Sequence, residues 1–164
     1  MDSLIALANP VAGLLKLRRE TLAIAESSAG GLINAALVAV PGASAYYLGG
    51  CIIYTPRARA ALLGITNEEL SGMRSASEPY ARLLAQCVRA KLGASWGVAE
   101  TGASGPTGNR YGDAPGHACL AISGPIDAVI TLETGEADRE ANMRAFARRA
   151  IELLQACLQQ AARS

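Results

Sequence analysis

The sequence predicts an α/β protein, a three-layer α/β/α sandwich around a mixed β-sheet that forms a single domain. Three observations support this prediction. Apolar stretches with helical spacing alternate with short β-type stretches. Residues 124–127 are the only link between two β-type stretches near the C-terminus, which favours an antiparallel hairpin. No linker, repeat or low-complexity segment divides the 164 residues. Such alternation places helices on both faces of the sheet.

Composition indicates which binding partners and which cellular compartment to expect. Because 51% of the residues are hydrophobic and only 4% are aromatic, we expect an aliphatic core. A net charge of +1 gives no reason to expect nucleic acid or a membrane surface as the main partner. No apolar run reaches the ~20 residues that span a bilayer, and Met1-Asp2-Ser3 lacks the basic start of a signal peptide. The protein is expected to be cytoplasmic, with buried, reduced thiols at Cys51, Cys87, Cys119 and Cys157.

The N-terminal part alternates helix and strand. Residues 3–18 carry apolar side chains at helical spacing and predict an amphipathic helix that Pro10 kinks or restarts. Residues 21–25 predict a short strand, followed by a polar turn and an apolar helix. Residues 46–54 predict a buried strand, in which Gly49-Gly50 indicates a bulge or a close contact.

The rest of the chain continues this alternation. Thr55-Pro56 is typical of a helix start, and Gly64 of its end. The other predicted elements are a helix over about 77–91, strands over 95–101, 117–123 and 128–134, a glycine-rich loop over 102–115, and a C-terminal helix from about Asp138.

Three predicted strands end in polar and glycine residues, at Glu26–Gly31, Tyr54–Arg59 and Thr101–Gly108. The ligand crevice of an open α/β sheet lies at the carboxyl ends of its strands. We therefore expect these three segments to meet at one small pocket.

The first segment places Ser27 and Ser28 between a strand and a helix start. Free backbone N–H groups at such a turn bind anions or stabilise an oxyanion, and a serine there is a candidate nucleophile or phosphate ligand. The alternative is that one of these serines only caps the helix. The sequence leaves both interpretations open.

The other two segments also allow two interpretations. Tyr54 and Arg59 are candidate site residues, whereas the alternative is a buried tyrosine followed by two solvated arginines, Arg57 and Arg59. The amides of the glycine-rich loop suit a phosphate or a carboxylate, although the loop lacks the P-loop signature. His117, the only histidine, is expected to be a packed or edge residue, and no metal site is predicted.

Taken together, these stretches resemble the C-terminal domain of CinA, the nicotinamide mononucleotide deamidase family. The resemblance covers nearly all of residues 1–164, in the family's order, through TLAIAESSAGG, VPGASAYYLGGCIIYTPRARAALLGI, AETGASGPTG, APGHACLAI and ADREANMR. It implies an α/β/α fold, a homodimer or higher homo-oligomer, and hydrolysis of nicotinamide mononucleotide to nicotinate mononucleotide and ammonia without a cofactor.

The resemblance also implies roles for individual residues. Ser27 takes the position of the nucleophile, Tyr54 that of a catalytic tyrosine, and Arg59 that of a catalytic lysine. The residues that it implies in substrate binding are Glu26, Ser28, Gly30, Gly31, Thr101, Gly102, Gly105 and Arg139.

Two positions depart from the family pattern. Arg59 replaces the lysine, and a guanidinium stays protonated, so it cannot serve as the base for a serine. Ala29 replaces a threonine and removes one hydroxyl donor. The expected function is therefore an amidohydrolase in which Arg59 holds phosphate or negative charge. The alternatives are a nucleotide-binding or interaction module without turnover, and an enzyme acting on a different amide.

Overall fold

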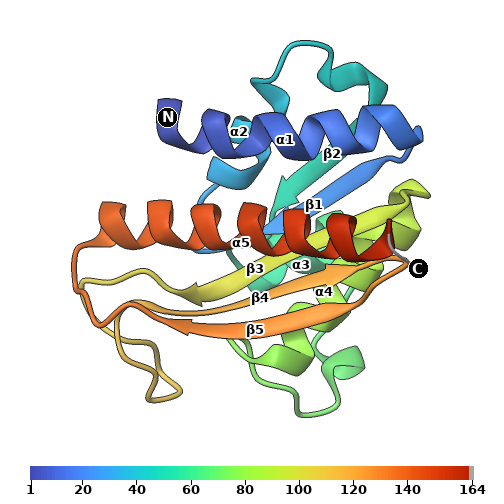
Figure 1. Cartoon of the computed structure of the whole chain (residues 1–164). Helices are drawn as coiled ribbons and strands as arrows, with labels where there is room; N and C mark the ends of the chain where they lie inside the picture. Colours follow the sequence, from blue (N-terminus) through green and yellow to red (C-terminus); the bar gives the residue numbers. More distant parts are fainter. Residues whose placement is uncertain (163–164) are drawn as a thin grey trace.

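One mixed five-stranded sheet with the order β2-β1-β3-β4-β5 organises the fold. The computed structural model describes residues 1–162 (Figure 1). β1 (Leu22–Glu26), β2 (Tyr47–Ile52) and β3 (Trp96–Ala103) are parallel. β4 (His117–Ser123) is antiparallel to β3, and β5 (Ala128–Glu133) is antiparallel to β4. The predicted mixed sheet and its C-terminal hairpin are confirmed.

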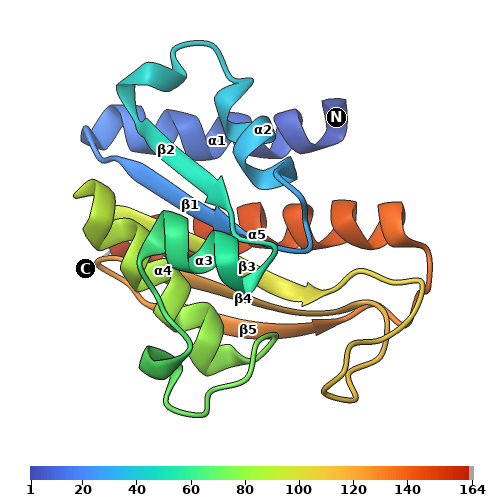
Figure 2. The same ribbon diagram turned by 180° about the vertical axis from the view of Figure 1, so that it is seen from behind.

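Helices cover both faces of this sheet. α1 (Asp2–Arg18), α2 (Leu32–Val38) and α5 (Arg139–Ala161) lie on one face (Figure 1). α3 (Pro56–Leu63) and α4 (Glu78–Leu92) lie on the other face, which is in front in Figure 2. The predicted three-layer sandwich is therefore confirmed.

Local signals fixed several helix ends. The Thr55 hydroxyl accepts a hydrogen bond from the Ala58 amide at 3.1 Å, and α3 ends at Gly64 with φ of 77°. Asp138 caps α5. Pro10 lies inside α1, which continues across it without a restart.

The core has two aliphatic clusters, one on each face of the sheet. The cluster beneath α1, α2 and α5 includes Leu15, Ile24 and Ile151. The cluster beneath α4 is built from smaller side chains on the sheet, such as Ala25 and Ala99, which allow the helix to approach closely. Both clusters agree with the predicted aliphatic core.

The strand predicted over 46–54 is shorter and less buried than expected. β2 is an outer strand with one neighbour, so its side chains alternate between half-buried and exposed. Ile52, for example, is 45% exposed. The predicted close contact is present at Gly50, where an added Cβ would lie 1.9 Å from Asn34 Oδ1. The expectation of four buried thiols holds for Cys119 and Cys157, whereas Cys51 and Cys87 are half-buried.

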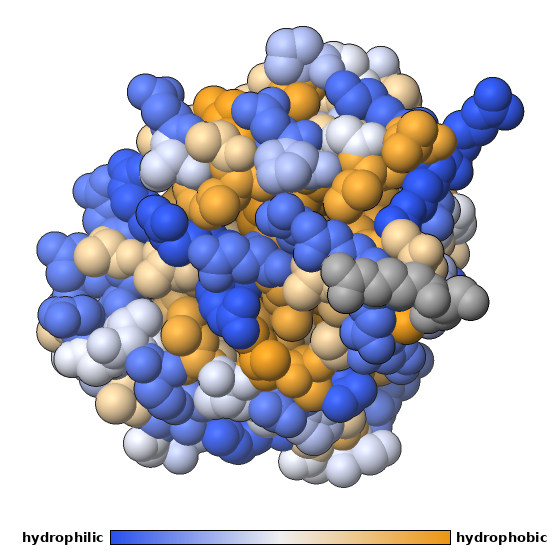
Figure 3. Space-filling model, viewed as in Figure 1, coloured by the Kyte–Doolittle hydropathy of each residue, from blue (hydrophilic) through white to orange (hydrophobic). Residues whose placement is uncertain are grey.

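The outer face formed by α1 and α5 mixes hydrophobic and hydrophilic residues (Figure 3). None of the helices within residues 1–162 combines the length and the hydropathy that a membrane crossing requires.

The close approach of α4 to the sheet gives a stability prediction. An added Cβ at Gly97 would lie 2.2 Å from the Ala85 carbonyl oxygen. Gly97→Ala is expected to lower the free energy of unfolding by about 1–3 kcal/mol, because backbone must shift to relieve the overlap. Gly13→Ala on α1, where nothing lies within 4 Å, is the control and should stabilise the protein by about 0.5–1 kcal/mol. Urea denaturation of both variants measures the difference, and equal effects would contradict this packing.

Candidate functional site

The carboxyl ends of the three parallel strands open onto one pocket of about 280 Å³. Ser27 reaches it from the end of β1, Tyr54 and Arg59 from the segment after β2, and Thr101 and Gly102 from β3. The structure thus brings together the three polar segments that the sequence singled out.

A second hollow of about 240 Å³ adjoins this pocket, because Tyr54 and Gly102 line both. Its other lining residues include Ser28, Gly105 and Arg139. The candidate site therefore consists of the two hollows side by side.

Ser27 is held by its backbone, while its side chain is free. Its amide donates to Glu100 Oε2 at 3.0 Å, and the residue is half-buried. Within residues 1–162 the Ser27 hydroxyl has no hydrogen-bond partner. It is consequently available to whatever occupies the pocket.

Glu100 lines neither hollow but supports the turn that carries both serines, and the sequence reasoning missed it. This carboxylate is fully buried, and its Oε2 also accepts from the Ala29 amide at 2.8 Å. Its Oε1 accepts from the Ser28 hydroxyl. Burial raises the pKa of Glu100 to about 7, although these hydrogen bonds lower it, and the charge of Glu26 raises it further. The only signal in the sequence was a charged residue within an apolar strand.

Glu26 holds the other half of the same turn. Its carboxylate accepts from the Gly31 amide at 2.9 Å and from the backbone and side-chain nitrogens of Asn34 at 2.6 and 2.7 Å. Burial raises the pKa of Glu26, and the hydrogen bonds from Asn34 and Gly31 oppose this rise. Glu26 lines neither hollow.

These contacts correct two expectations for the first segment. Several amides expected to be free for an anion instead donate to the carboxylates of Glu26 and Glu100. Neither Ser27 nor Ser28 caps α2, whose N-cap is Gly31 without a side-chain hydrogen bond. Buried carboxylates bind N–H groups more strongly than a serine hydroxyl does, so they take these donors.

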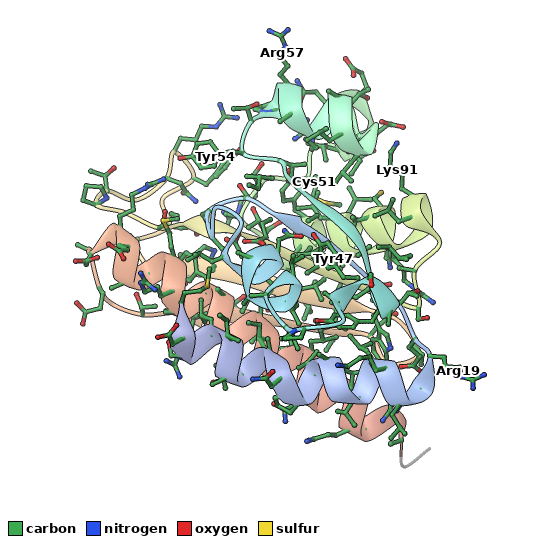
Figure 4. All side chains as sticks on the ribbon, turned by 90° about the horizontal axis from the view of Figure 1, so that it is seen from above. Arg19, Tyr47, Cys51, Tyr54, Arg57 and Lys91 are labelled. Carbon is green, nitrogen blue, oxygen red and sulfur yellow. The ribbon has the colours of Figure 1, made fainter. Side chains whose placement is uncertain are left out.

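Tyr54 and Arg139 are joined across the second hollow. The Tyr54 oxygen accepts from Arg139 Nη2 at 3.1 Å, and Arg139 Nη1 donates to the Gly105 carbonyl at 2.6 Å. Tyr54 is 59% exposed, so the alternative of a buried tyrosine is wrong. It lies beyond the end of β2, on the side of the molecule where α5 begins (Figure 4). The reason for its exposure is that β2 is an edge strand.

The two arginines after β2 have opposite surroundings. Arg57 is exposed and points away from the molecule (Figure 4). Arg59 is only 3% exposed, and its Nε and Nη2 donate to the Ile65 carbonyl at 3.0 Å and to Asn67 Oδ1 at 2.5 Å. The alternative of two solvated arginines therefore holds for Arg57 alone.

Two glycines of the site allow neighbouring backbone segments to pack closely against them. An added Cβ at Gly102 would lie 2.3 Å from the His117 carbonyl oxygen, and one at Gly105 would lie 2.6 Å from that of Ala137. Gly30 and Gly31 have positive φ and form the turn before α2, and they line neither hollow. These two glycines therefore shape the turn before α2, and their expected part in substrate binding stays a prediction.

His117 supports the opposite wall of the pocket. Its Nε2 lies 2.9 Å from the Ala76 carbonyl oxygen, and its Nδ1 contacts the Glu133 carboxylate. The Ala76 amide in turn donates to Thr101 Oγ1 at 3.2 Å. Ala76 lines the pocket with a positive φ of 54°, which these hydrogen bonds hold. His117 is packed, as expected.

Other lining residues were not singled out from the sequence. Tyr80, Ser75, Asn109 and Tyr111 also border the larger hollow. Asn109 and Tyr111 belong to the glycine-rich loop predicted over 102–115, whereas tertiary contacts bring Ser75 and Tyr80 to the site from segments without a local motif. Within residues 1–162, no three His, Cys, Asp or Glu side chains are grouped to hold a metal ion.

Comparison with known proteins gives one consistent result. The CinA C-terminal domain matches residues 4–158. The CinA-like protein of Prochlorococcus marinus (strain MIT 9313) is 42% identical over 120 residues, which are 73% of this chain and 28% of that protein. The CinA-like protein of Anaeromyxobacter sp. (strain K) is 37% identical over 148 residues, which are 90% of this chain and 36% of that protein. This chain therefore spans only 28% to 36% of the length of these relatives.

Solved structures show the same fold. A CinA superfamily protein from Klebsiella pneumoniae 700603 superimposes with a TM-score of 0.89 and 26% identity, covering 96% of this chain and 98% of the other. The competence/damage inducible protein CihA from Agrobacterium tumefaciens gives a TM-score of 0.85 and 29% identity, covering 95% of each chain.

The contacts of His117 predict a raised imidazole pKa. Burial lowers the pKa of His117, but hydrogen bonds to Glu133 and Ala76, with the charge of Asp113, raise it above 6.5 overall. Both ring nitrogens face acceptors, which requires the imidazolium. Stability from this group is therefore complete below pH 6.5 and lost as the pH rises through the folded-state pKa. Because the sequence has one histidine, its NMR titration is unambiguous, and a midpoint at or below 6.5 would contradict these contacts.

Proposed function

This chain belongs to the CinA C-terminal domain family, and from that premise we propose that it hydrolyses the carboxamide of a pyridine nucleotide. The proposed reaction converts nicotinamide mononucleotide and water to nicotinate mononucleotide and ammonia. The observation that carries the proposal is the unpartnered Ser27 hydroxyl, which shares one pocket with Tyr54 and Thr101.

The proposed chemistry is acyl transfer to a serine. Ser27 Oγ attacks the carboxamide carbon, the tetrahedral intermediate expels ammonia, and water then hydrolyses the acyl-enzyme. Tyr54 is suited to relay the proton that Ser27 Oγ loses, because its oxygen can take up that proton while its own O–H proton passes to the leaving nitrogen. Its oxygen already accepts from Arg139, so its own O–H remains free to donate into the site.

The second hollow is proposed to hold the phosphate. A guanidinium has five N–H donors, and Arg139 uses one toward Gly105 and one toward Tyr54. The remaining donors suit a phosphate oxygen in the hollow that Arg139 lines. The reactive carboxamide would then lie in the neighbouring hollow beside Ser27.

A second function is favoured by the surroundings of Arg59. Its guanidinium is fixed by Ile65 and Asn67 and stays protonated, so it offers no base for Ser27. The same pocket would then bind a nucleotide without turnover. In that case Arg59→Lys supplies the missing base, and ammonia release appears only in this variant.

The proposed compartment and oligomeric state rest on the family and on the cysteines. The four cysteines are free thiols, which suits the reducing cytoplasm. We expect the protein to act there as a homodimer or higher homo-oligomer.

Removal of the nucleophile tests the enzymatic proposal. Ser27→Ala is expected to reduce ammonia release from nicotinamide mononucleotide by roughly 10³-fold or more, since only binding and polarisation remain. Ser3→Ala, at an exposed position of α1, is the control. Unchanged release in Ser27→Ala would remove the nucleophile assignment. Binding without release in the unmodified protein, measured by calorimetry, would favour the binding module.

Removal of the phosphate ligand is a separate test. Arg139→Ala is expected to weaken the binding of nicotinamide mononucleotide by about 10- to 100-fold, the usual loss for hydrogen bonds to a charged group. Arg57→Ala, which removes an exposed arginine that points away from the molecule, should leave the affinity unchanged. Calorimetric titration measures both, and equal losses in the two variants would contradict the proposed phosphate position.

A further inference from the structure

Two buried carboxylates bind the turn that carries Ser27 and Ser28 to the candidate site. Glu26 ends β1, Glu100 lies in β3, and the charge of Glu26 acts on Glu100. Both are fully buried and face the turn that leads into α2. Two carboxylates so placed repel each other, and a proton shared with one of them relieves the repulsion.

The hydrogen-bond partners decide which carboxylate takes the proton. Among residues 1–162 the partners of the Glu26 carboxylate are the amides of Gly31 and Ile33 and the two nitrogens of Asn34, which are donors only. A proton on Glu26 would find no acceptor among them. Glu100 differs, because the Ser28 hydroxyl, which both donates and accepts, is the only hydrogen-bond partner of its Oε1 among residues 1–162.

Glu100 therefore has a way to bind a proton without losing a partner. Its Oε2 keeps the amides of Ser27 and Ala29 in either state. A proton on Oε1 reverses the remaining hydrogen bond, so that Glu100 donates to Ser28 Oγ. The Ser28 hydroxyl then needs a new acceptor. Ser28 lines the hollow that also contains Arg139 and Gly105.

We propose that Glu100 and Ser28 form a proton-controlled hydrogen-bond donor for an oxygen acceptor of the ligand, such as a phosphate or carboxamide oxygen. When Glu100 is ionised, the Ser28 O–H is held by the carboxylate. When Glu100 is protonated, the Ser28 O–H is released toward the hollow. Glu100 acts through Ser28 and is thus a positioning residue. The identity of the ligand rests on the proposed function, whereas the reversal rests on the contacts of Glu100 alone.

The surroundings of Glu100 place its titration near neutral pH. Burial raises its pKa to about 7, the Ser28 hydroxyl and the amides of Ala29 and Ser27 oppose this, and the charge of Glu26 adds to it. α2 contributes the neutral Asn34 beside Glu26, and α5 contributes the uncharged Met143 beside Gly30. The donor is therefore expected to change state within the physiological range.

Glu100→Gln separates the two states. The glutamine oxygen replaces Oε2 as acceptor of the two amides, and its NH₂ group donates to Ser28 Oγ, which reproduces protonated Glu100. Affinity for nicotinamide mononucleotide is measured by calorimetry from pH 6 to pH 8, with and without Glu100→Gln, in a Ser27→Ala background that prevents turnover. Because both proteins meet the same ligand, its own titration cancels from the ratio of their dissociation constants.

The proposal predicts how the ratio of the dissociation constants changes with pH. Ser28 can donate to the ligand only while Glu100 is protonated. The protein that keeps Glu100 should therefore bind nicotinamide mononucleotide about as tightly as Glu100→Gln at pH 6 and about tenfold more weakly at pH 8. Adding Ser28→Ala should weaken binding at both pH values and remove the change in the ratio. A ratio that stays constant from pH 6 to pH 8 would overturn the proposal.

A ligand-free measurement separates this inference from the proposed function. Infrared spectra of the wild type and of Glu100→Gln are compared from pH 5 to pH 9 for the band of one protonated carboxyl group. If only the wild type loses that band near pH 7, the result supports the reversal of the hydrogen bond between Glu100 and Ser28. It does so even if the nucleotide fails to bind and the proposed function is wrong. A Glu100 that stays ionised down to pH 5 overturns the inference whatever the ligand. Denaturation provides a check on folding, because the wild type should lose more stability than Glu100→Gln as the pH rises from 4.5 to about 7.

Discussion

The turn between β1 and α2 depends on two buried carboxylates that bind its backbone amides. Glu26 and Glu100 come from neighbouring parallel strands and accept hydrogen bonds at 2.6 to 3.0 Å. Burying an ionised carboxylate is costly unless several donors surround it, and here the amides of the turn supply them. The turn therefore has one stable position, and Ser27 and Ser28 are presented at the edge of the sheet. A serine on an unsupported loop would have no fixed direction.

The other walls of the site are fixed by the same kind of contact. Thr101 and His117 hold the amide and the carbonyl of Ala76, a residue whose positive φ is otherwise unfavourable. Arg139 joins the start of α5 to Tyr54 and to the loop after β3. Each contact connects two segments that are distant in the sequence. The pocket is thus part of the packed fold, and its shape depends on polar contacts between layers.

The position of Arg59 limits the chemistry that this member of the family can use. Its guanidinium is buried and fixed by the segment after α3, so it shapes one wall and stays cationic. The only strongly perturbed carboxyl beside the serines, among residues 1–162, is Glu100. Glu100 is thus the carboxyl group next to the serines whose pKa lies near neutral pH. Arg59 thus contributes charge and packing to this wall.

The sequence by itself determined the elements and several of their ends, because these depend on neighbours along the chain. Helical spacing predicted α1, α4 and α5, and the Thr55 cap and Gly64 bounded α3 as observed. The three polar strand ends also identified the edge where the pockets lie. Only the tertiary structure decided that β2 is an exposed edge strand, that Arg59 is buried, and that Glu100 binds a turn more than 70 residues away. Burial and hydrogen bonding of a polar side chain depend on which distant segments surround it, and no local pattern records that.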